Sequence, residues 1–345
     1  MALKWIDGFD HYGTGANLAT AYYRTGSISV STSRKRTGTH GLYSMVSAAD
    51  YITKYFSDLN NWQPTEVWCG VALNIDSMIN TVYALTVVND SNNAHGWVSI
   101  TNTGVINIGD SLSSIKDSSG GGVIPLDQWI HIEYYLKLGS GGSGAAQVRV
   151  NGSLLLSDTT GDYQYGSDSY FKGLKLAGAS NLIIYYDDLY IDDAQFNGPL
   201  RIHTFAPDSD GTHTDFVRSG GSNDYEMVDE MSPDGDTTNI EGSSQGDKST
   251  FGYTLTGITD DILAVQVASQ NRRTAGGNTA KLKNMVRVGG SDYLSSPEQI
   301  LTDTYAYHQT VWAVNPDTSN AWNETTVEAA EFGITISNLS TTTTT

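Results

Sequence analysis

One stretch of the sequence has the spelling of a serine nucleophile. Gly242-Ser243-Ser244-Gln245-Gly246 matches Gly-x-Ser-x-Gly, a pattern in which a tight turn presents the serine hydroxyl for attack on a carbonyl. That chemistry needs a strand before the turn, a helix after it, and a histidine and an acid within reach. The residues that follow, Asp247 to Phe251, are polar and then strand-like, so the sequence predicts an ordinary loop here.

Paired carboxylates are a second chemistry to consider, because glycoside hydrolases use two of them roughly 5 to 10 Å apart. Acids at alternate residues of a β-strand would share one face and supply such a pair. The sequence has no run of the kind Glu-x-Asp-x-Glu, and the nearest approach, Glu226, Asp229 and Glu230, lies in a segment without strand character. We therefore expect that the chain is not an enzyme.

A third group of acids resembles the beginning of a calcium loop. Asp208, Asp210 and Asp215 surround a glycine, but an EF-hand needs glycine at the sixth position and glutamate at the twelfth, where this chain has His213 and Ser219. A looser Ca²⁺ site built from these acids, or from Asp234 and Asp236, stays open beside the alternative of solvated turn acids. The seven histidines are scattered without the spacing of zinc ligands, and no other cofactor is indicated.

Two further clusters suggest contacts rather than catalysis. Arg34, Lys35 and Arg36 form the one dense basic run, which is either a solvated loop or a contact with an acidic patch on a neighbouring subunit. Several tyrosines lie in polar, glycine-rich surroundings, and a tyrosine offers a large contact area at little rotamer entropy. They predict a surface that stacks on sugars or contacts a subunit, or else they simply pack at strand ends. These tyrosines are Tyr22, Tyr23, Tyr163, Tyr165 and Tyr170.

The overall composition excludes other classes of partner. The chain has 38 Asp and Glu against 19 Lys and Arg, so its net charge of -19 repels phosphate backbones and anionic lipids. We expect no nucleic-acid or membrane partner. The single cysteine, Cys69, lies in an apolar run and is predicted to be a buried thiol, and no intrachain disulfide can form. Because Met1 to Asp7 lacks the apolar core of a secretory signal, folding in a cytoplasm is expected.

The elements that must position these residues are strands. Short apolar or alternating runs are separated by clusters of Gly, Asn, Asp and Ser, a pattern typical of sandwiches and barrels, and Asn151-Gly152 predicts a two-residue hairpin turn. The predicted strands are residues 67–75, 82–88, 97–101, 105–108, 129–138, 147–150, 171–177, 182–191, 200–205, 261–269, 280–288, 306–314 and 326–336. One short helix is predicted at 296–303, from a serine cap followed by proline.

The length of 345 residues predicts two domains, because single cores seldom grow beyond roughly 250–300 residues. Gly139 to Gly144 has a linker's composition, but it lies between two predicted strands and is read as a hairpin tip. A run of acids followed by Asn197-Gly198-Pro199 marks a better boundary. The chain is therefore divided into a sandwich at 1–197, a second sandwich at 198–339 and a flexible threonine tail at 340–345.

Several motifs carry a family resemblance. Trp129-Ile130-His131-Ile132-Glu133, followed by a hairpin that ends at Asn151-Gly152, resembles the laminin G-like pattern. Asp187 to Asp192 resembles that family's closing strand, and Ile6 to Asp10 the N-terminal strand with which it pairs. The resemblance implies an all-β chain of two β-sandwich (jelly-roll) domains, the first concanavalin A-like.

A second resemblance concerns the whole chain. The opening at Asp7-Gly8-Phe9-Asp10, together with Ala264 to Val267 and Asn315 to Thr318, resembles structural proteins of tailed bacteriophages. It implies a virion protein assembled in the host cytoplasm, either a tail-associated appendage that contacts host-surface carbohydrate or a capsid decoration or head-fibre protein. A glycan hydrolase is the least favoured alternative. Other virion proteins and further copies of the chain, as a trimer or larger ring, are the expected partners, since linked sites gain avidity.

Overall fold

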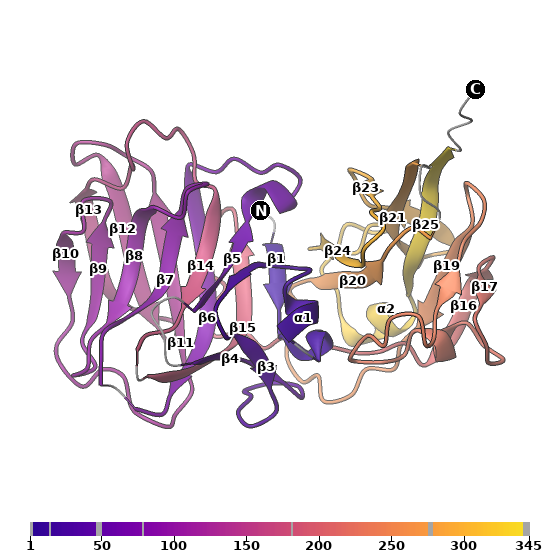
Figure 1. Cartoon of the computed structure of the whole chain (residues 1–345), viewed down its shortest axis with the longest axis horizontal. Coiled ribbons are helices and arrows are strands. Elements are labelled where there is room, and N and C mark those ends of the chain that lie inside the picture. Colours follow the sequence, from indigo (N-terminus) through magenta and orange to yellow (C-terminus); the bar gives the residue numbers. More distant parts are fainter. Residues whose placement is uncertain are drawn as a thin grey trace. The chain divides into compact units, whose positions relative to one another are not determined.

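The computed structural model describes residues 3–13, 15–45, 50–77, 79–180, 182–274 and 279–340, without the side chains of Ser44 and Met45. Contacts divide the chain into two compact units, Met1–His203 and Thr204–Thr345. Both are built almost entirely from antiparallel strands (Figure 1). The predicted class, all-β with sandwich domains of the jelly-roll kind, is confirmed. Within the described residues, no helix is long and apolar enough to cross a membrane.

The first unit is a sandwich of two sheets. The larger sheet has the strand order β13-β12-β11-β6-β15-β4-β3, with β1 also paired to β15. Its strands are β1 (Leu3–Asp7), β3 (Ser29–Ser31), β4 (Gly41–Met45), β6 (Glu66–Ile75), β11 (Ile130–Lys137), β12 (Gly144–Val150), β13 (Ser153–Gly161) and β15 (Ile183–Asp192). Asn151 and Gly152 both have positive φ in the turn between β12 and β13, as predicted.

The smaller sheet has the order β10-β9-β8-β7-β14-β5-β2. Its strands are β2 (Tyr23–Thr25), β5 (Tyr51–Tyr55), β7 (Val82–Val88), β8 (Ala94–Ile100), β9 (Ile106–Asp110), β10 (Ile115–Ser118) and β14 (Gly173–Ala177). Three single-turn helices connect strands: η1 (Asp10–Tyr12), α1 (Gly15–Leu18) and η2 (Phe56–Asp58).

Alternation along the strands builds the core between the two sheets. Val71 on β6 and Tyr134 on β11 are fully buried and face the smaller sheet. Gly96 on β8 has no room for a side chain, because a Cβ there would lie 2.6 Å from the Tyr134 hydroxyl. Each large apolar side chain buried here contributes roughly 1.5–3 kcal/mol. Cys69 points into the same core, as predicted, and burial raises the pKa of its thiol.

The second unit packs a main sheet of order β16-β19-β25-β21-β22, with β23 on β21, against the separate pair β20–β24. Val267, Val286, Trp322 and Phe332 lie in the core between them. The elements are β16 (Ser209–Thr214), β17 (Val217–Arg218), η3 (Tyr225–Met227), β18 (Ile240–Glu241), β19 (Lys248–Gly252), β20 (Val265–Asn271), β21 (Thr279–Val288), β22 (Ser291–Leu294), β23 (Gln299–Ile300), β24 (Ala306–Trp312), α2 (Glu324–Glu328) and β25 (Glu331–Ser340).

Four sequence predictions for this part of the chain are wrong. Residues 200–205 form no strand, and 296–303 contains β23 rather than a helix. The last predicted strand begins too early, because Asn323 and Thr326 form a reciprocal capping box that starts α2. Ser340 pairs with Thr279 at the end of β25 instead of lying in a tail. The predicted flexible tail at 341–345 lies outside the described residues.

The two units meet in sequence at His203 and Thr204, whereas the sequence analysis placed the boundary at Asn197 to Pro199. The intervening segment is tied to the first unit. The Arg36 guanidinium donates to the Leu200 carbonyl at 2.7 Å, and the Ile202 amide donates to Asp188 Oδ1 at 2.8 Å. Residues 197–203 therefore close the first sandwich.

Candidate functional site

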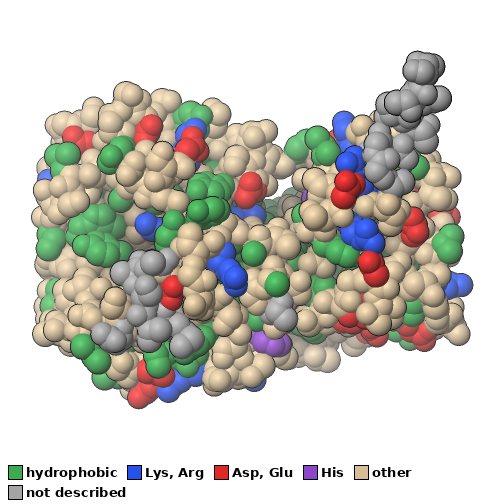
Figure 2. Space-filling view, viewed as in Figure 1, with side chains coloured by type: hydrophobic (Ala, Val, Ile, Leu, Met, Phe, Trp, Pro, Cys, Tyr) green, Lys and Arg blue, Asp and Glu red, His purple; other side chains and the backbone are tan. Residues whose placement is uncertain are grey.

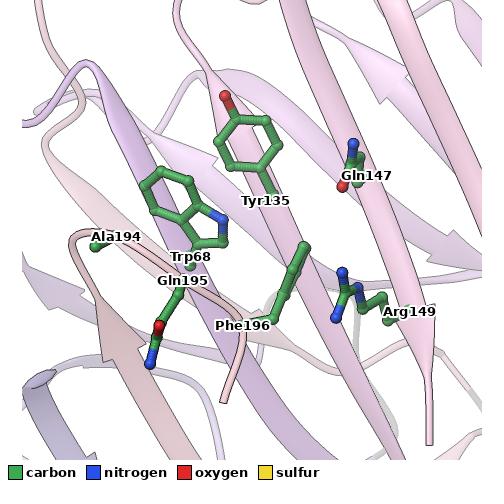
Figure 3. A pocket seen from close by; sticks show the side chains of 7 residues that line it. All are labelled: Trp68, Tyr135, Gln147, Arg149, Ala194, Gln195 and Phe196. Atoms are coloured by element: carbon green, nitrogen blue, oxygen red, sulfur yellow. The ribbon is translucent and has the colours of Figure 1, made fainter. Parts of the chain in front are cut away.

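A pocket of about 410 Å³ lies on the outer face of the larger sheet (Figure 3). Its floor comes from β6, β11 and β12, and one wall comes from the segment that follows β15. The lining side chains combine three aromatic rings with amides and a guanidinium: Trp68, Tyr135, Gln147, Arg149, Ala194, Gln195 and Phe196. The volume lies within the range of small-ligand sites.

The register of the sheet places the floor residues. Trp68, Tyr135 and Gln147 occupy one row across β6, β11 and β12, because Tyr135 pairs with both of the others. Arg149 follows two residues after Gln147 and so projects from the same face. The intervening residues of these strands point into the core. The core therefore fixes the strands whose outward side chains form the pocket.

The aromatic rings are held in defined positions. The Trp68 and Tyr135 ring centroids are 4.6 Å apart with the planes inclined by 31°. The Arg149 guanidinium carbon lies 4.3 Å from the centroid of the Phe196 ring, a cation–π contact. Figure 3 shows these rings and the guanidinium arranged around the open centre of the pocket. They offer flat apolar surfaces beside hydrogen-bond donors.

Hydrogen bonds to buried acids fix the wall that contains Phe196. Asp192 Oδ1 accepts from the amides of Ala194 and Gln195, at 2.8 and 3.1 Å. Glu133 Oε1 accepts from the Gly198 amide at 2.7 Å and from the Tyr190 hydroxyl at 2.5 Å. The wall is therefore anchored on both sides of Phe196.

The hydroxyl of the lining residue Tyr135 is hydrogen-bonded to a carboxylate beside the pocket. The Tyr135 hydroxyl donates to Glu66 Oε2 at 3.0 Å, and burial together with this contact raises the pKa of the phenol. Glu66 also lies 3.7 Å from the Lys137 ammonium. No carboxylate or histidine is among the lining residues. The lining thus offers aromatic rings and hydrogen-bonding groups to a ligand.

Two of the five predicted contact tyrosines are buried, so the prediction of an exposed surface is wrong for them. The Tyr22 hydroxyl donates to Asp7 at 2.6 Å and accepts from the Trp5 indole at 2.9 Å. The Tyr163 hydroxyl donates to Asp158 at 2.9 Å. Polar neighbours in the sequence suggested exposure, but their carboxylates serve as internal acceptors for the phenols.

The other three tyrosines are accessible without forming one surface. Tyr23 is 49% exposed on the smaller sheet, where its ring lies 6.2 Å from Tyr51 and 6.0 Å from Tyr55. Tyr165 is exposed, and the half-buried Tyr170 accepts a hydrogen bond from Lys172. All five predicted tyrosines are described, and none has a ring contact with another.

The smaller sheet carries its own aromatic residues. Tyr83, half exposed, meets Trp97 edge-on with ring centroids 5.0 Å apart. Figure 2 shows hydrophobic side chains gathered over β7 and β8 on the face in view.

Two residues of the basic run have partners within the chain, and the predicted subunit contact stays a prediction. Arg34 pairs with Asp76 and Asp127 at 3.1 and 2.9 Å. Arg36 is nearly buried against Asp188 at 2.7 Å. Only Lys35 of the three is exposed. The sequence could not show this, because the partner acids lie far along the chain.

The acids proposed for calcium do not gather. Asp208 Oδ2 accepts from the Thr254 amide, Asp210 Oδ1 from the Tyr225 amide and Asp215 Oδ2 from the Lys248 amide. No group of three or more potential ligands occurs in the described part of the chain. The spacing failed as a guide because Asp210 lies on β16 and Asp208 and Asp215 flank its two ends, so the acids are spread along a strand rather than gathered in a loop.

Sequence reasoning missed every residue of the pocket. A signal was present, since Trp68, Tyr135 and Arg149 alternate with core residues in strands that were predicted. The fact that they share one site depends on the order and register of β6, β11 and β12. A single sequence does not reveal that register.

Comparisons with known proteins identify no family for this chain. No family model matches the chain, and no curated protein matches it. Alginate lyase Aly36B is 16% identical, covers 56% of this chain and 97% of its own, and has a TM-score of 0.38. Endo-β-1,4-glucuronan lyase from the fungus Trichoderma reesei is 11% identical, with coverages of 56% and 96% and a TM-score of 0.40.

Trypanosoma rangeli sialidase is similar over a smaller part of its length. It is 10% identical, the match covers 49% of this chain and 27% of the sialidase, and the TM-score is 0.36. At such identities and scores the likeness extends to the β fold alone. What the chain does must be argued from its own residues.

Proposed function

We propose that this chain is a structural protein of a tailed-phage virion whose first unit binds host-surface carbohydrate without cleaving it, as part of a tail-associated appendage. The observation that supports binding is the pocket of Trp68, Tyr135, Gln147, Arg149 and Phe196. It joins flat aromatic rings to hydrogen-bond donors and has no acid–base pair.

The pocket suits a sugar for chemical reasons. One face of a pyranose ring is rich in C–H groups and packs against an aromatic ring, while its hydroxyls need donors and acceptors at the edge. Trp68 and Tyr135 supply the rings, and Gln147 supplies an amide beside them. Aromatic residues contribute large apolar contact area with a polar edge, which is what a partly apolar ligand needs.

The proposal that the chain is not an enzyme rests on the side chains that line this pocket. Most glycoside hydrolases use two carboxyl groups, one on either side of the glycosidic bond. Glu66, the acid beside the lining, is engaged by Tyr135 and lies near Lys137. The lining therefore lacks the pair of carboxyl groups that such hydrolases use.

The virion assignment rests on the short sequence motifs that resemble phage structural proteins. A capsid decoration or head-fibre protein is the alternative within the same class. Either role implies several copies on the particle, as a trimer or larger ring, with virion proteins as neighbours. Density for the protein on the particle tests both points. An appendage at the tail with several symmetric copies would support the proposal, and a single unpaired copy would count against it.

The test of binding uses the full chain and oligosaccharides from the host surface. Calorimetry should show binding that Trp68→Ala weakens at least ~10-fold, equivalent to about 1.4 kcal/mol. Tyr83→Ala, which removes an exposed ring from the other sheet, is the matched control and should leave binding unchanged. New reducing ends during incubation, or a loss of binding in the Tyr83 variant alone, would contradict the proposal.

A further inference from the structure

Arg149 differs from every other arginine of the chain. The chain has nine arginines, all within the described residues. Eight of them donate at least one hydrogen bond from the guanidinium to a side chain or a carbonyl: Arg24, Arg34, Arg36, Arg201, Arg218, Arg272, Arg273 and Arg287. Arg149 makes no side-chain hydrogen bond or ion pair with any described residue, although acids outnumber bases two to one.

The position of the Arg149 guanidinium makes this observation informative. Its Nε is buried without a hydrogen-bond acceptor, and the Phe196 ring holds the guanidinium plane from one side. A buried donor without an acceptor costs about 1–3 kcal/mol. In Figure 3 the guanidinium lies at the edge of the open pocket. A ligand that enters the pocket can supply the missing acceptor.

Glu133 is the nearest acid by register, because it lies directly opposite Arg149 in the β11–β12 ladder. It does not form an ion pair with Arg149. Its Oε1 accepts from Tyr190 and Gly198 instead, at the base of the wall. The Glu133 carboxylate therefore offsets part of the positive charge of Arg149, but it accepts no hydrogen bond from the five guanidinium N–H donors.

We propose that the pocket binds an acidic sugar, with Arg149 receiving its carboxylate while the sugar ring packs against Trp68 and Tyr135. This inference rests on the proposed function and names its ligand class. A planar carboxylate matches the planar guanidinium fork and can accept two parallel hydrogen bonds. One guanidinium balances one carboxylate. A doubly charged phosphate would remain partly unbalanced in a lining with no second cation.

The test compares the full chain on two ligands that differ in one group. A hexuronic-acid oligosaccharide from the host surface is set beside its carboxyl-reduced form, in which each carboxylate is a neutral hydroxymethyl group. Calorimetry should show the acidic form binding at least ~10-fold more tightly. Arg149→Gln should abolish this preference. Lys35→Gln removes the same unit of charge from an exposed site outside the pocket and should preserve it.

The outcomes separate this inference from the proposed function. Equal binding of both ligands that still depends on Trp68 would leave the carbohydrate function standing and overturn the acidic ligand. Preference for a phosphorylated glycan over the uronate would also overturn it. Binding of neither ligand, nor of neutral host glycans, would refute the function itself.

A structural role for Arg149 would leave a different signature. Because the side chain makes no hydrogen bond within the described residues, Arg149→Gln should keep the melting temperature of the parent chain. A fall of several degrees in the melting temperature with unchanged ligand preference would show that Arg149 stabilises the fold by balancing the charge of Glu133. That result would overturn the inference. Arg149→Lys keeps the charge and loses the fork, so we expect an affinity between those of the parent and of the glutamine variant.

Discussion

Arg36 and Arg149 lie against the outer side of the same sheet and have opposite surroundings. Arg36 donates to Asp188 and to the carbonyls of Leu200 and Pro199, and its side chain is only 10% exposed. Arg149 lies beside an open pocket, where its guanidinium packs against the Phe196 ring. The half of the sheet face around Arg36 is covered by a polar hydrogen-bond network and is called the sealed half. The half around Arg149 is open to solvent.

The difference shows how to separate structural from functional charges. Burial raises the pKa values of Asp187 and Asp188, and around Asp188 the Ile202 amide and Arg36 counteract that shift. Each group in this network has its partner supplied by the fold. The fold supplies no acceptor for the guanidinium N–H groups of Arg149 among the described residues. These groups can therefore donate hydrogen bonds to a ligand. Stability measurements can therefore test the assignment of each residue.

The largest effect is expected for Arg36→Met. Removing the guanidinium leaves Asp188, which has no exposed surface, without its charged partner and releases the 199–200 segment. Breaking a buried pair in this way costs about 3–5 kcal/mol. Urea unfolding monitored by fluorescence measures the loss. A change below about 1 kcal/mol would show that the sealed half does not depend on this contact.

His131, on the sealed half, should make the chain sensitive to acid. Burial, with Arg36 and Arg201 nearby, lowers the pKa of His131 to about 3, so the folded state holds it neutral. The unfolded chain takes up the proton near pH 6.5, so this contribution to stability is present above that pH and is lost as the pH falls towards 3.

The change His131→Phe removes that titration and keeps a ring against Tyr190. Between pH 7 and pH 5 the parent should lose about 2 kcal/mol more than the variant, because the unfolded parent alone gains a proton at this position. Urea unfolding of both chains at the two pH values measures the difference. Parallel losses would mean that His131 is already protonated in the fold or accessible to water.

Tyr135→Phe probes the border between the two halves. It removes the hydrogen bond to Glu66 and leaves the ring that stacks beside Trp68. We expect a loss of about 0.5–1 kcal/mol in the free energy of unfolding, because the bond is partly exposed. Carbohydrate affinity should be unchanged if the ring, rather than the hydroxyl, makes the contact. A loss of affinity without a loss of stability would reassign the hydroxyl to ligand binding.

The smallest effect on stability is expected for Arg149→Gln, within about 0.5 kcal/mol, since no hydrogen bond within the described residues is lost. The same variant should show the greatest loss of ligand preference. Chemical unfolding and calorimetry on one preparation provide both numbers. A large stability loss here would remove the contrast with Arg36.

The sequence predicted what depends on local rules. Eight strands predicted between residues 67 and 191, the hairpin at Asn151-Gly152 and the burial of Cys69 all follow from alternation or turn chemistry, and the structure confirms them, while β10 and β13 in the same range were missed. Strand order is not local, so the pairing of Trp68 with Tyr135 could not be foreseen. Tyr163 was misplaced for the same reason, since its burial depends on the fold around Asp158.

The pairing of the first strand has a consequence for biosynthesis. Trp5 on β1 pairs with Ile191 on β15, and the hydrogen bonds of Arg36 and Asp188 are completed by backbone groups of residues 199–202. At ~5–20 residues per second, β1 leaves the ribosome roughly 10 to 40 s before its partner strand. During that interval its edge is unpaired and its apolar side chains need shielding. The strand that is made first is thus among the last to be placed, and slow translation over this unit would prolong its exposure to aggregation.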